Sequence, residues 1–590
     1  MSFHKFRPAL GVAMLSALSL VTHAAAPDTP RRPNILLVVA DDLGYSDIGA
    51  FGGEIKTPTL DGLAKSGVRL SGFYASPFCS PTRAMLLSGM DNHLAGMGTM
   101  GELINSFQKG KPGYEGYLNN RVAPFPEVLR QSGYHTYMVG KWHVGLSEEV
   151  SPAKRGFEQS YALVQGGAAH WDQTGIITFD ANKAPVALYR ENGKQVNLPE
   201  KFYSSEFYAD RMIQYIDSNK GDGKPFLAYV AFTAPHWPLQ APESFIKKYE
   251  DTYKVGYEVI RKQRIAKMKE MGIIPKDTQA DQGNPVWPKW SQLSAEQKKQ
   301  EAKRMAVYAA MVDAMDYHLG RIIDHLKKTG EYDNTFIFFM SDNGAEGNTI
   351  LDEGQDRSWS RMHRDNSVEN IGKATSFAEY GPNWAQVGAA PFRMYKAFQY
   401  EGGISSPAIA VYPKLQGKGT IKPQFSHVTD VAPTLLELAG LEPVGRTYEG
   451  REVIPMQGKS MLSFLTGQAP AVHGKDHVTG WELGGRKAIR KGDWKLVYAN
   501  WPWGAGRWEL FDLAKDRTEQ HNLADKYPKK VEELLAAYQD YMKTNGVVDA
   551  PGIADRPGYS NSVSYYDDVA NEAAPQRTNF YDPVNAEAEK

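Results

Sequence analysis

Cysteine is nearly absent from this chain of 590 residues, in which Cys79 is the only one. A single cysteine excludes a disulfide within one molecule. A surplus of either charge is absent too, because 67 basic residues are balanced by 68 acidic ones. This balance gives no support for nucleic acid or an anionic membrane as a partner. Hydrophobic residues make up 42% of the chain, enough for a large globular core.

Long apolar runs are absent beyond the N-terminus. The chain opens with two basic residues, Lys5 and Arg7, followed by an apolar run over residues 9–21 and then by alanines. This order predicts a cleaved secretory signal peptide over residues 1–26, with an uncleaved anchor as the alternative. The run is too short to span a bilayer comfortably. We therefore expect a periplasmic or secreted protein without stable membrane association.

Four short apolar runs end in polar residues or are followed by them, and helical patterns occur between runs along the chain. The runs are PNILLVVADD (33–42), HTYMVG (135–140), KPFLAYVAFTAPH (224–236) and NTFIFFMSDNG (334–344). Such an alternation predicts a parallel sheet covered by helices on both faces. Ligands of these folds bind beyond the carboxyl ends of the strands, which is where the polar residues fall.

The C-terminal part has a different sequence pattern. Residues 478–500 and 507–524 are typical of short antiparallel strands with turns, and residues 528–546 of a closing helix. We expect a catalytic α/β domain over residues 27–444 and a smaller domain over residues 445–546. Residues 547–590 are polar and lack periodicity, which predicts a surface-draped or disordered tail.

Acidic residues cluster at two of the predicted strand ends. Asp41 and Asp42 follow one strand, and Asp342 and Asn343 follow another. Any one of them could cap a helix or a turn. Adjacent carboxylates repel each other unless a cation or protons separate them, and this set of oxygens suits Ca²⁺ or Mg²⁺ better than zinc. The spacing alone leaves a metal site and a structural role equally open.

Basic groups and histidines follow other strands. Lys141 and His143 lie in VGKWHVG, His236 lies between prolines in TAPHWP, and Lys396 lies in RMYKAF. Taken singly, such a histidine is more often structural than catalytic, and such a lysine usually lies at the surface.

Cys79 has three interpretations. It could be a small buried hydrophobe or the nucleophile of a Cys–His pair. It also lies just before a predicted amphipathic helix, TRAMLLSG, and near Arg83. Since a helix N-terminus and a guanidinium both favour anions, the third interpretation is a site for an anionic substrate.

The segment CSPTRAMLLSG (79–89) resembles the sulfatase signature, in which the cysteine is oxidised to formylglycine. GYHTYMVGKWHVGL (133–146) resembles the second signature of that family. Further segments are similar to bacterial type I arylsulfatases, namely ADDLGYSDIGAFGGEIKTP, GKPGYEGYLNNRV, APHWPLQAP, MSDNGAEG, YKAF and VTGWEL. The resemblance runs from about residue 32 to residue 548. It implies an alkaline-phosphatase-like α/β fold, with a mixed, mostly parallel sheet flanked by helices. It also implies a smaller C-terminal α+β domain with a four-stranded antiparallel sheet.

The resemblance also implies an activity and the residues that carry it. The activity is hydrolysis of aryl or alkyl sulfate monoesters to an alcohol or phenol and inorganic sulfate. The implied ligands of one Ca²⁺ ion are Asp41, Asp42, Asp342, Asn343 and the residue at position 79. The implied catalytic and substrate-binding residues are hydrated formylglycine at position 79, Arg83, which steadies it, the sulfate-binding Lys141 and Lys396, and the histidines His143 and His236.

The chemistry of a sulfate monoester agrees with these roles. The substrate is an anion, so a cation and nearby basic side chains would offset its charge. A geminal diol has two hydroxyls. One attacks sulfur with help from Asp342, while His236 protonates the leaving oxygen. His143 takes the proton of the second hydroxyl, and sulfate is expelled as the aldehyde re-forms.

Three alternatives remain at this stage. A phosphonate monoester or phosphodiester hydrolase would share the metal site and the formylglycine. A catalytically silent binding protein would keep the fold but lose active-site groups, and none is missing here. A Cys–His thiol hydrolase would use Cys79 unmodified.

The resemblance predicts a maturation enzyme as a partner, and the modification can be measured directly. The peptide that contains position 79 should weigh about 18 Da less than its sequence requires, because CHO replaces CH₂SH. Mass spectrometry of a proteolytic digest checks this. Fully active protein with an unmodified Cys79 would contradict the formylglycine mechanism.

Overall fold

The structure is a computed structural model that describes residues 1–2, 4, 31–176, 184–284, 287–347, 359, 363–501 and 503–548. Most of the predicted signal peptide and all but the first two residues of the predicted tail lie outside these ranges. Within them, we find no helix with both the length and the apolarity needed to cross a bilayer.

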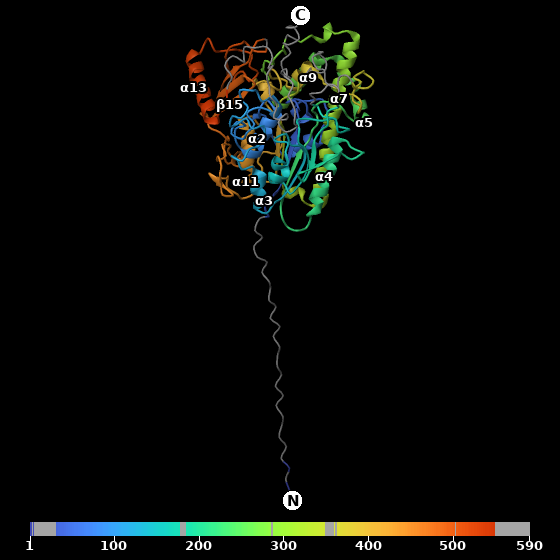
Figure 1. The fold of residues 1–590 in the computed structure, drawn as a ribbon, viewed down its shortest axis with the longest axis vertical. Helices are drawn as coiled ribbons and strands as arrows, with labels where there is room; N and C mark the ends of the chain where they lie inside the picture. The colour runs from blue at the N-terminus through green and yellow to red at the C-terminus, as the bar shows by residue number, and fades with distance from the viewer. Residues whose placement is uncertain are drawn as a thin grey trace. The chain divides into compact units, whose positions relative to one another are not determined.

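A ten-stranded sheet forms the centre of the body that begins at residue 32 (Figure 1). Its strand order is β11-β2-β10-β9-β1-β8-β4-β5-β6-β7. The strands are β1 (Asn34–Ala40), β2 (Val68–Leu70), β4 (His135–Lys141), β5 (Gln159–Leu163), β6 (Tyr189–Glu191), β7 (Lys194–Val196), β8 (Phe226–Ala231), β9 (Thr335–Ser341), β10 (Ala408–Val411) and β11 (Ile421–Lys422). The consecutive strands β9, β1, β8, β4 and β5 are parallel, whereas β10, β6 and β7 pair antiparallel with their neighbours.

The central strand β1 shows why the sheet is covered on both faces. All seven of its residues are buried. Leu36 and Val38 contribute to one apolar cluster, and Leu37 and Val39 contribute to another. Because successive side chains of a strand point to opposite faces, a continuous apolar run requires a helical layer on each side.

Two sets of helices supply these layers. The first cluster includes residues of α1 (Pro58–Ser66), α4 (Ser204–Ser218), α5 (Glu243–Ile246), α6 (Tyr257–Met271), α7 (Ala295–Thr329), α9 (Gly381–Gly388) and α10 (Glu401–Ile404). The second includes residues of α2 (Cys79–Ser88), α3 (Phe125–Gln131), α11 (Val431–Leu438) and α12 (Leu462–Leu465). In Figure 1, α4, α5 and α7 lie on one side of the sheet and α3 and α11 on the other.

The C-terminal part has its own antiparallel sheet of four strands in sequence order. They are β15 (Val478–Leu483), β16 (Arg486–Lys491), β17 (Trp494–Tyr498) and β18 (Glu509–Asp512). The last helix, α13 (Pro528–Asn545), packs against this sheet through the apolar cluster of Ile489, Leu496, Leu510, Leu534 and Tyr538.

The predicted fold class is confirmed, with a mixed, mostly parallel sheet flanked by helices and a second, antiparallel sheet. One local prediction is wrong. The helix after Cys79 was expected to be amphipathic, but α2 begins at Cys79 itself and all ten of its residues are buried. Its neighbours α3 and α11 and the sheet cover it from several sides, which local sequence cannot indicate.

A buried ion cluster connects the C-terminal sheet to α10. Nζ of Lys495, on β17, lies 2.9 Å from Oε1 of Glu401 and 2.8 Å from Oε1 of Glu519, and all three side chains are fully buried. A charge in such a place is tolerated only because it is paired.

We expect Lys495→Met to lower the free energy of unfolding by about 3–5 kcal/mol, because Glu519 would lose its cation in the interior. Urea titration measures this. Lys515→Met is the matched control, because Lys515 pairs with Asp512 from a largely exposed position and its loss should leave the urea midpoint unchanged. Equal midpoints for both variants would contradict the importance of the cluster.

Candidate active site

Four adjacent parallel strands, β9, β1, β8 and β4, end at one edge of the large sheet. Predicted site residues lie at the end of each strand or within a few residues after it. These are Asp342 and Asn343 after β9, Asp41 and Asp42 after β1, His236 after β8, and Lys141 with His143 at the end of β4. Cys79 and Arg83 come from α2, and Lys396 comes from the segment between α9 and α10. Tertiary structure therefore brings the predicted set to one edge, as ligand sites of open α/β sheets require.

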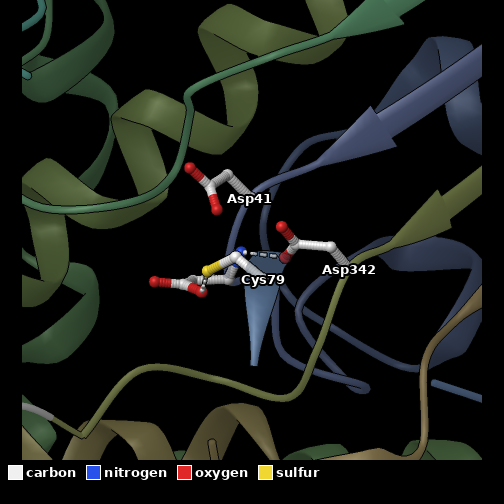
Figure 2. A group of neighbouring side chains, drawn as sticks. Asp41, Cys79 and Asp342 are labelled. Atoms are coloured by element: carbon white, nitrogen blue, oxygen red, sulfur yellow. Dashed lines mark hydrogen bonds between the residues drawn. The ribbon is translucent and has the colours of Figure 1, made fainter. Parts of the chain in front are cut away.

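The acidic residues surround Cys79. One side-chain ligand atom from each of Asp41, Asp42, Cys79 and Asp342 lies within 4.8 Å of all the others. Figure 2 shows Asp41, Cys79 and Asp342 gathered around a common space. Asn343 adds a buried carbonyl oxygen, Oδ1, that has no hydrogen-bond partner in the structure, while its Nδ2 donates to Asp42 over 2.7 Å. Carboxylate oxygens and an unsatisfied amide oxygen fit a hard divalent cation such as Ca²⁺ or Mg²⁺.

The charged groups of this cluster alter one another's pKa values. Burial raises the pKa of Asp41 to about 8, and Asp342 and Asp42 add to this against the opposing charge of Lys141. Burial acts on Asp42 as well, but Lys396 and other nearby cations outweigh it and lower the pKa of that carboxyl. A cation bound at this cluster would favour the ionised form of Asp41 and displace its proton.

Three basic side chains neutralise the three aspartates. The pairs are Arg83 Nη2 with Asp342 Oδ2 at 2.7 Å, Lys141 Nζ with Asp41 Oδ1 at 2.8 Å, and Lys396 Nζ with Asp42 Oδ2 at 2.8 Å. All of these side chains are almost completely buried. A divalent cation among the aspartates would add positive charge beside these basic groups and so favour an anionic ligand.

Cys79 is buried at the first position of α2, and its Sγ lies 3.6 Å from Oδ1 of Asp42. Burial raises the pKa of the thiol well above its usual range. A neutral thiol is a poor nucleophile, and this one donates to a carboxylate. Both observations weigh against a Cys–His thiol hydrolase.

The two histidines are neutral for the same reason. Burial lowers the pKa of His143 despite the nearby Glu102, and it lowers the pKa of His236 well below its usual range despite Asp42. Nε2 of His236 lies 3.4 Å from Oδ2 of Asp42. The ring of Trp237 stacks on His236 with centroids 5.5 Å apart, and Phe377 contacts Trp237 edge-on. An aromatic surface therefore lies beside one of the two histidines.

Backbone strain is concentrated at this site. Seven non-glycine residues among those described have a positive φ. Four of them are Asp42 (65°), His143 (57°) and the residues that bracket Lys396, Met394 (60°) and Ala397 (78°). Such conformations cost free energy and persist where surrounding contacts enforce a particular side-chain placement.

Two carboxylates at the site were missed from the sequence. Oε2 of Glu346 accepts a hydrogen bond from Nζ of Lys396 over 2.7 Å, and Oε1 of Glu102 lies 3.0 Å from Nε2 of His143. Glu346 follows Asn343 within MSDNGAEG, so that motif could have indicated it. Glu102 is 41 residues from His143, in a short 3-10 helix, and no local signal points to it.

Comparison with known proteins agrees with this geometry. The family model described as Sulfatase matches residues 33–441. The chain belongs to the sulfatase family. A second model, described as N-sulphoglucosamine sulphohydrolase, C-terminal, matches residues 392–545. The reaction of this family, hydrolysis of sulfate esters, is the one for which the site is built.

Individual sulfatases resemble the chain over most of its length. An uncharacterized sulfatase of Schizosaccharomyces pombe is 45% identical over 88% of this chain and 95% of its own. The arylsulfatase of Klebsiella aerogenes is 40% identical over 76% of this chain and 96% of its own. Among solved structures, Ps i-CgsB in complex with k-i-k-neocarrahexaose has a TM-score of 0.60 and 25% identity, covering 88% of this chain and 94% of its own.

We expect Ca²⁺ to stabilise this sulfatase after treatment with EDTA, by about 2.7 kcal/mol when the ion is at a hundred times its dissociation constant. Unfolding with and without added Ca²⁺ measures the gain. Asp41→Asn should remove most of it. Asp313→Asn, at a buried aspartate bonded to Lys248 and Tyr249 instead, should keep it. An equal gain in both variants would place the cation elsewhere.

Proposed function

We propose that the protein hydrolyses aryl sulfate monoesters at position 79, after conversion of Cys79 to formylglycine and with Ca²⁺ bound among the aspartates. The observation that carries this proposal is the convergence of Cys79, three carboxylates and three basic side chains at one edge of the sheet. The 40% identity to the Klebsiella arylsulfatase supports the aryl preference.

The protonation state of Cys79 favours formylglycine over the thiol as the nucleophile. Its thiol is buried and neutral, so it is ill suited to attack an anion. The hydrated aldehyde of formylglycine would supply two hydroxyls on one carbon, one for attack on sulfur and one for release of the product. Arg83 lies one helical turn from position 79. It donates two hydrogen bonds to Asp342, which fix the position of Asp342 relative to α2.

Substrate binding would use the remaining positive charge. Lys141 and Lys396 approach the cluster from different strands and loops and would contact the sulfate oxygens. Bound Ca²⁺ would add positive charge that lowers the cost of placing an anion beside the carboxylates. Position 79 at the N-terminus of α2 adds the favourable end of a helix dipole.

The leaving group would lie beside His236. Nδ1 of this ring contacts the carbonyl oxygen of Trp237 and must carry a proton there, so Nε2 is the nitrogen that faces the site. An anionic substrate favours the protonated ring, from which Nε2 can donate to the departing oxygen. The rings of Trp237 and Phe377 suit an aryl group at this position.

Maturation and export complete the proposal. Cys79 is only 1% exposed in the folded chain, so a maturation enzyme must act before folding. With a signal peptide over residues 1–26, this means before or during transport to the periplasm or the exterior. We also propose that the catalytic domain ends at residue 444 and that the smaller domain begins at residue 445.

A second substrate class is carbohydrate sulfates. The observation in its favour is the similarity to a solved structure that holds k-i-k-neocarrahexaose. Phosphonate monoesters and phosphodiesters remain the alternative within the wider superfamily.

The proposal predicts the order of rates on a substrate panel. Nitrophenyl sulfate should be hydrolysed faster than an alkyl sulfate, a sulfated sugar or a phenylphosphonate monoester, because only an aryl sulfate satisfies both the basic groups and the aromatic surface. Steady-state kcat/KM values measure this, with Cys79→Ala as the inactive control. A higher value for the sulfated sugar would replace the aryl assignment, and a higher value for the phosphonate would overturn the sulfatase assignment.

A further inference from the structure

The ring of His143 is held by a carboxylate that lies outside every sulfatase signature in the sequence. Glu102 belongs to a short 3-10 helix, Gly101–Leu103. Its Oε1 lies 3.0 Å from Nε2 of His143, and the two side chains are 6% and 3% exposed. A hydrogen bond in such a dry environment is stronger than one in water.

This contact determines which nitrogen of His143 carries the proton. An ionised carboxylate can only accept, so Nε2 must donate to Glu102. The other nitrogen, Nδ1, is buried and has no hydrogen-bond partner in the structure. In the neutral ring, Nδ1 therefore has the free lone pair, and it is the only ring atom of His143 that can accept a proton.

A glycine packs against the same pair. A Cβ atom at Gly166 would lie 2.8 Å from Cε1 of His143 and 3.0 Å from Oε1 of Glu102. Real Cβ atoms essentially never approach other atoms that closely, so any side chain at position 166 would displace the ring or the carboxylate. Gly167 lies near the second histidine, and a Cβ there would be 3.1 Å from Cε1 of His236.

We propose that Glu102 is a positioning residue that acts through His143, with Gly166 as the surface that keeps the two side chains in contact. Glu102 fixes the tautomer in which Nδ1 accepts a proton from the nucleophile at position 79, and its negative charge stabilises the ring once that proton has arrived. The inference rests on the proposed function for the identity of the nucleophile. The arrangement of Glu102, His143 and Gly166 itself does not depend on it.

The test replaces the carboxylate by an amide of the same shape. In ¹⁵N-histidine-labelled protein, the His143 resonances, assigned with His143→Gln, should show a proton on Nε2 alone. Glu102→Gln should abolish this preference, because an amide can accept or donate. Turnover of nitrophenyl sulfate should fall roughly ten- to a hundredfold in kcat while KM changes less than about twofold, as for other residues that orient a catalytic ligand.

Two further variants separate positioning from folding. Gly166→Ala should reproduce the loss of kcat, whereas Gly62→Ala, where an added Cβ would meet nothing within 4 Å, should not. Glu149→Gln, at an exposed glutamate, controls for loss of a charge alone. An unchanged tautomer and kcat in Glu102→Gln would overturn the proposal. If the wild type shows the Nε2 tautomer but hydrolyses no sulfate ester, the proposed function fails while the positioning contact stands.

Discussion

The repulsion among three buried carboxylates is the constraint on which the rest of the site depends. Asp41, Asp42 and Asp342 occupy one small volume with Cys79, and burial raises the pKa of Asp41 into the neutral range. No such cluster survives without compensating charge. The protein supplies one basic side chain for each aspartate, and a divalent cation would shift this balance toward the positive charge that an anionic ester needs.

The fold positions the charged groups in two ways, at the ends of regular strands and on strained backbone. Parallel strands place the carboxylates, because β1 and β9 are adjacent and end at the same edge. The compensating groups come from farther away, and the residues around Lys396 and at His143 adopt left-handed backbone conformations. Strain of this kind is tolerated where a dense set of contacts over-determines the backbone, and here it orients the groups that would bind substrate.

Burial strengthens the electrostatic interactions of the site, and it also limits when Cys79 can be modified. A thiol at the start of a helix with all ten residues buried is out of reach of any enzyme once the chain has folded. The environment also keeps both histidines neutral, so each ring has a definite donor and a definite acceptor nitrogen. The contacts with Glu102 and with the Trp237 carbonyl decide which nitrogen of each ring donates and which one is left to accept.

The sequence by itself determined four central strands of the large sheet, β1, β4, β8 and β9, because continuous apolar runs are local signals. The sulfatase signatures, which are also local, predicted the ten site residues. It also determined the C-terminal antiparallel strands and the final helix. Only the tertiary structure decided that α2 is buried on all sides, and that Glu102 lies against His143. Glu102 reaches its partner across 41 residues of chain, and the helices that cover α2 come from distant segments. Neither periodicity nor spacing in the sequence predicts contacts between segments that meet only when the sheet is assembled.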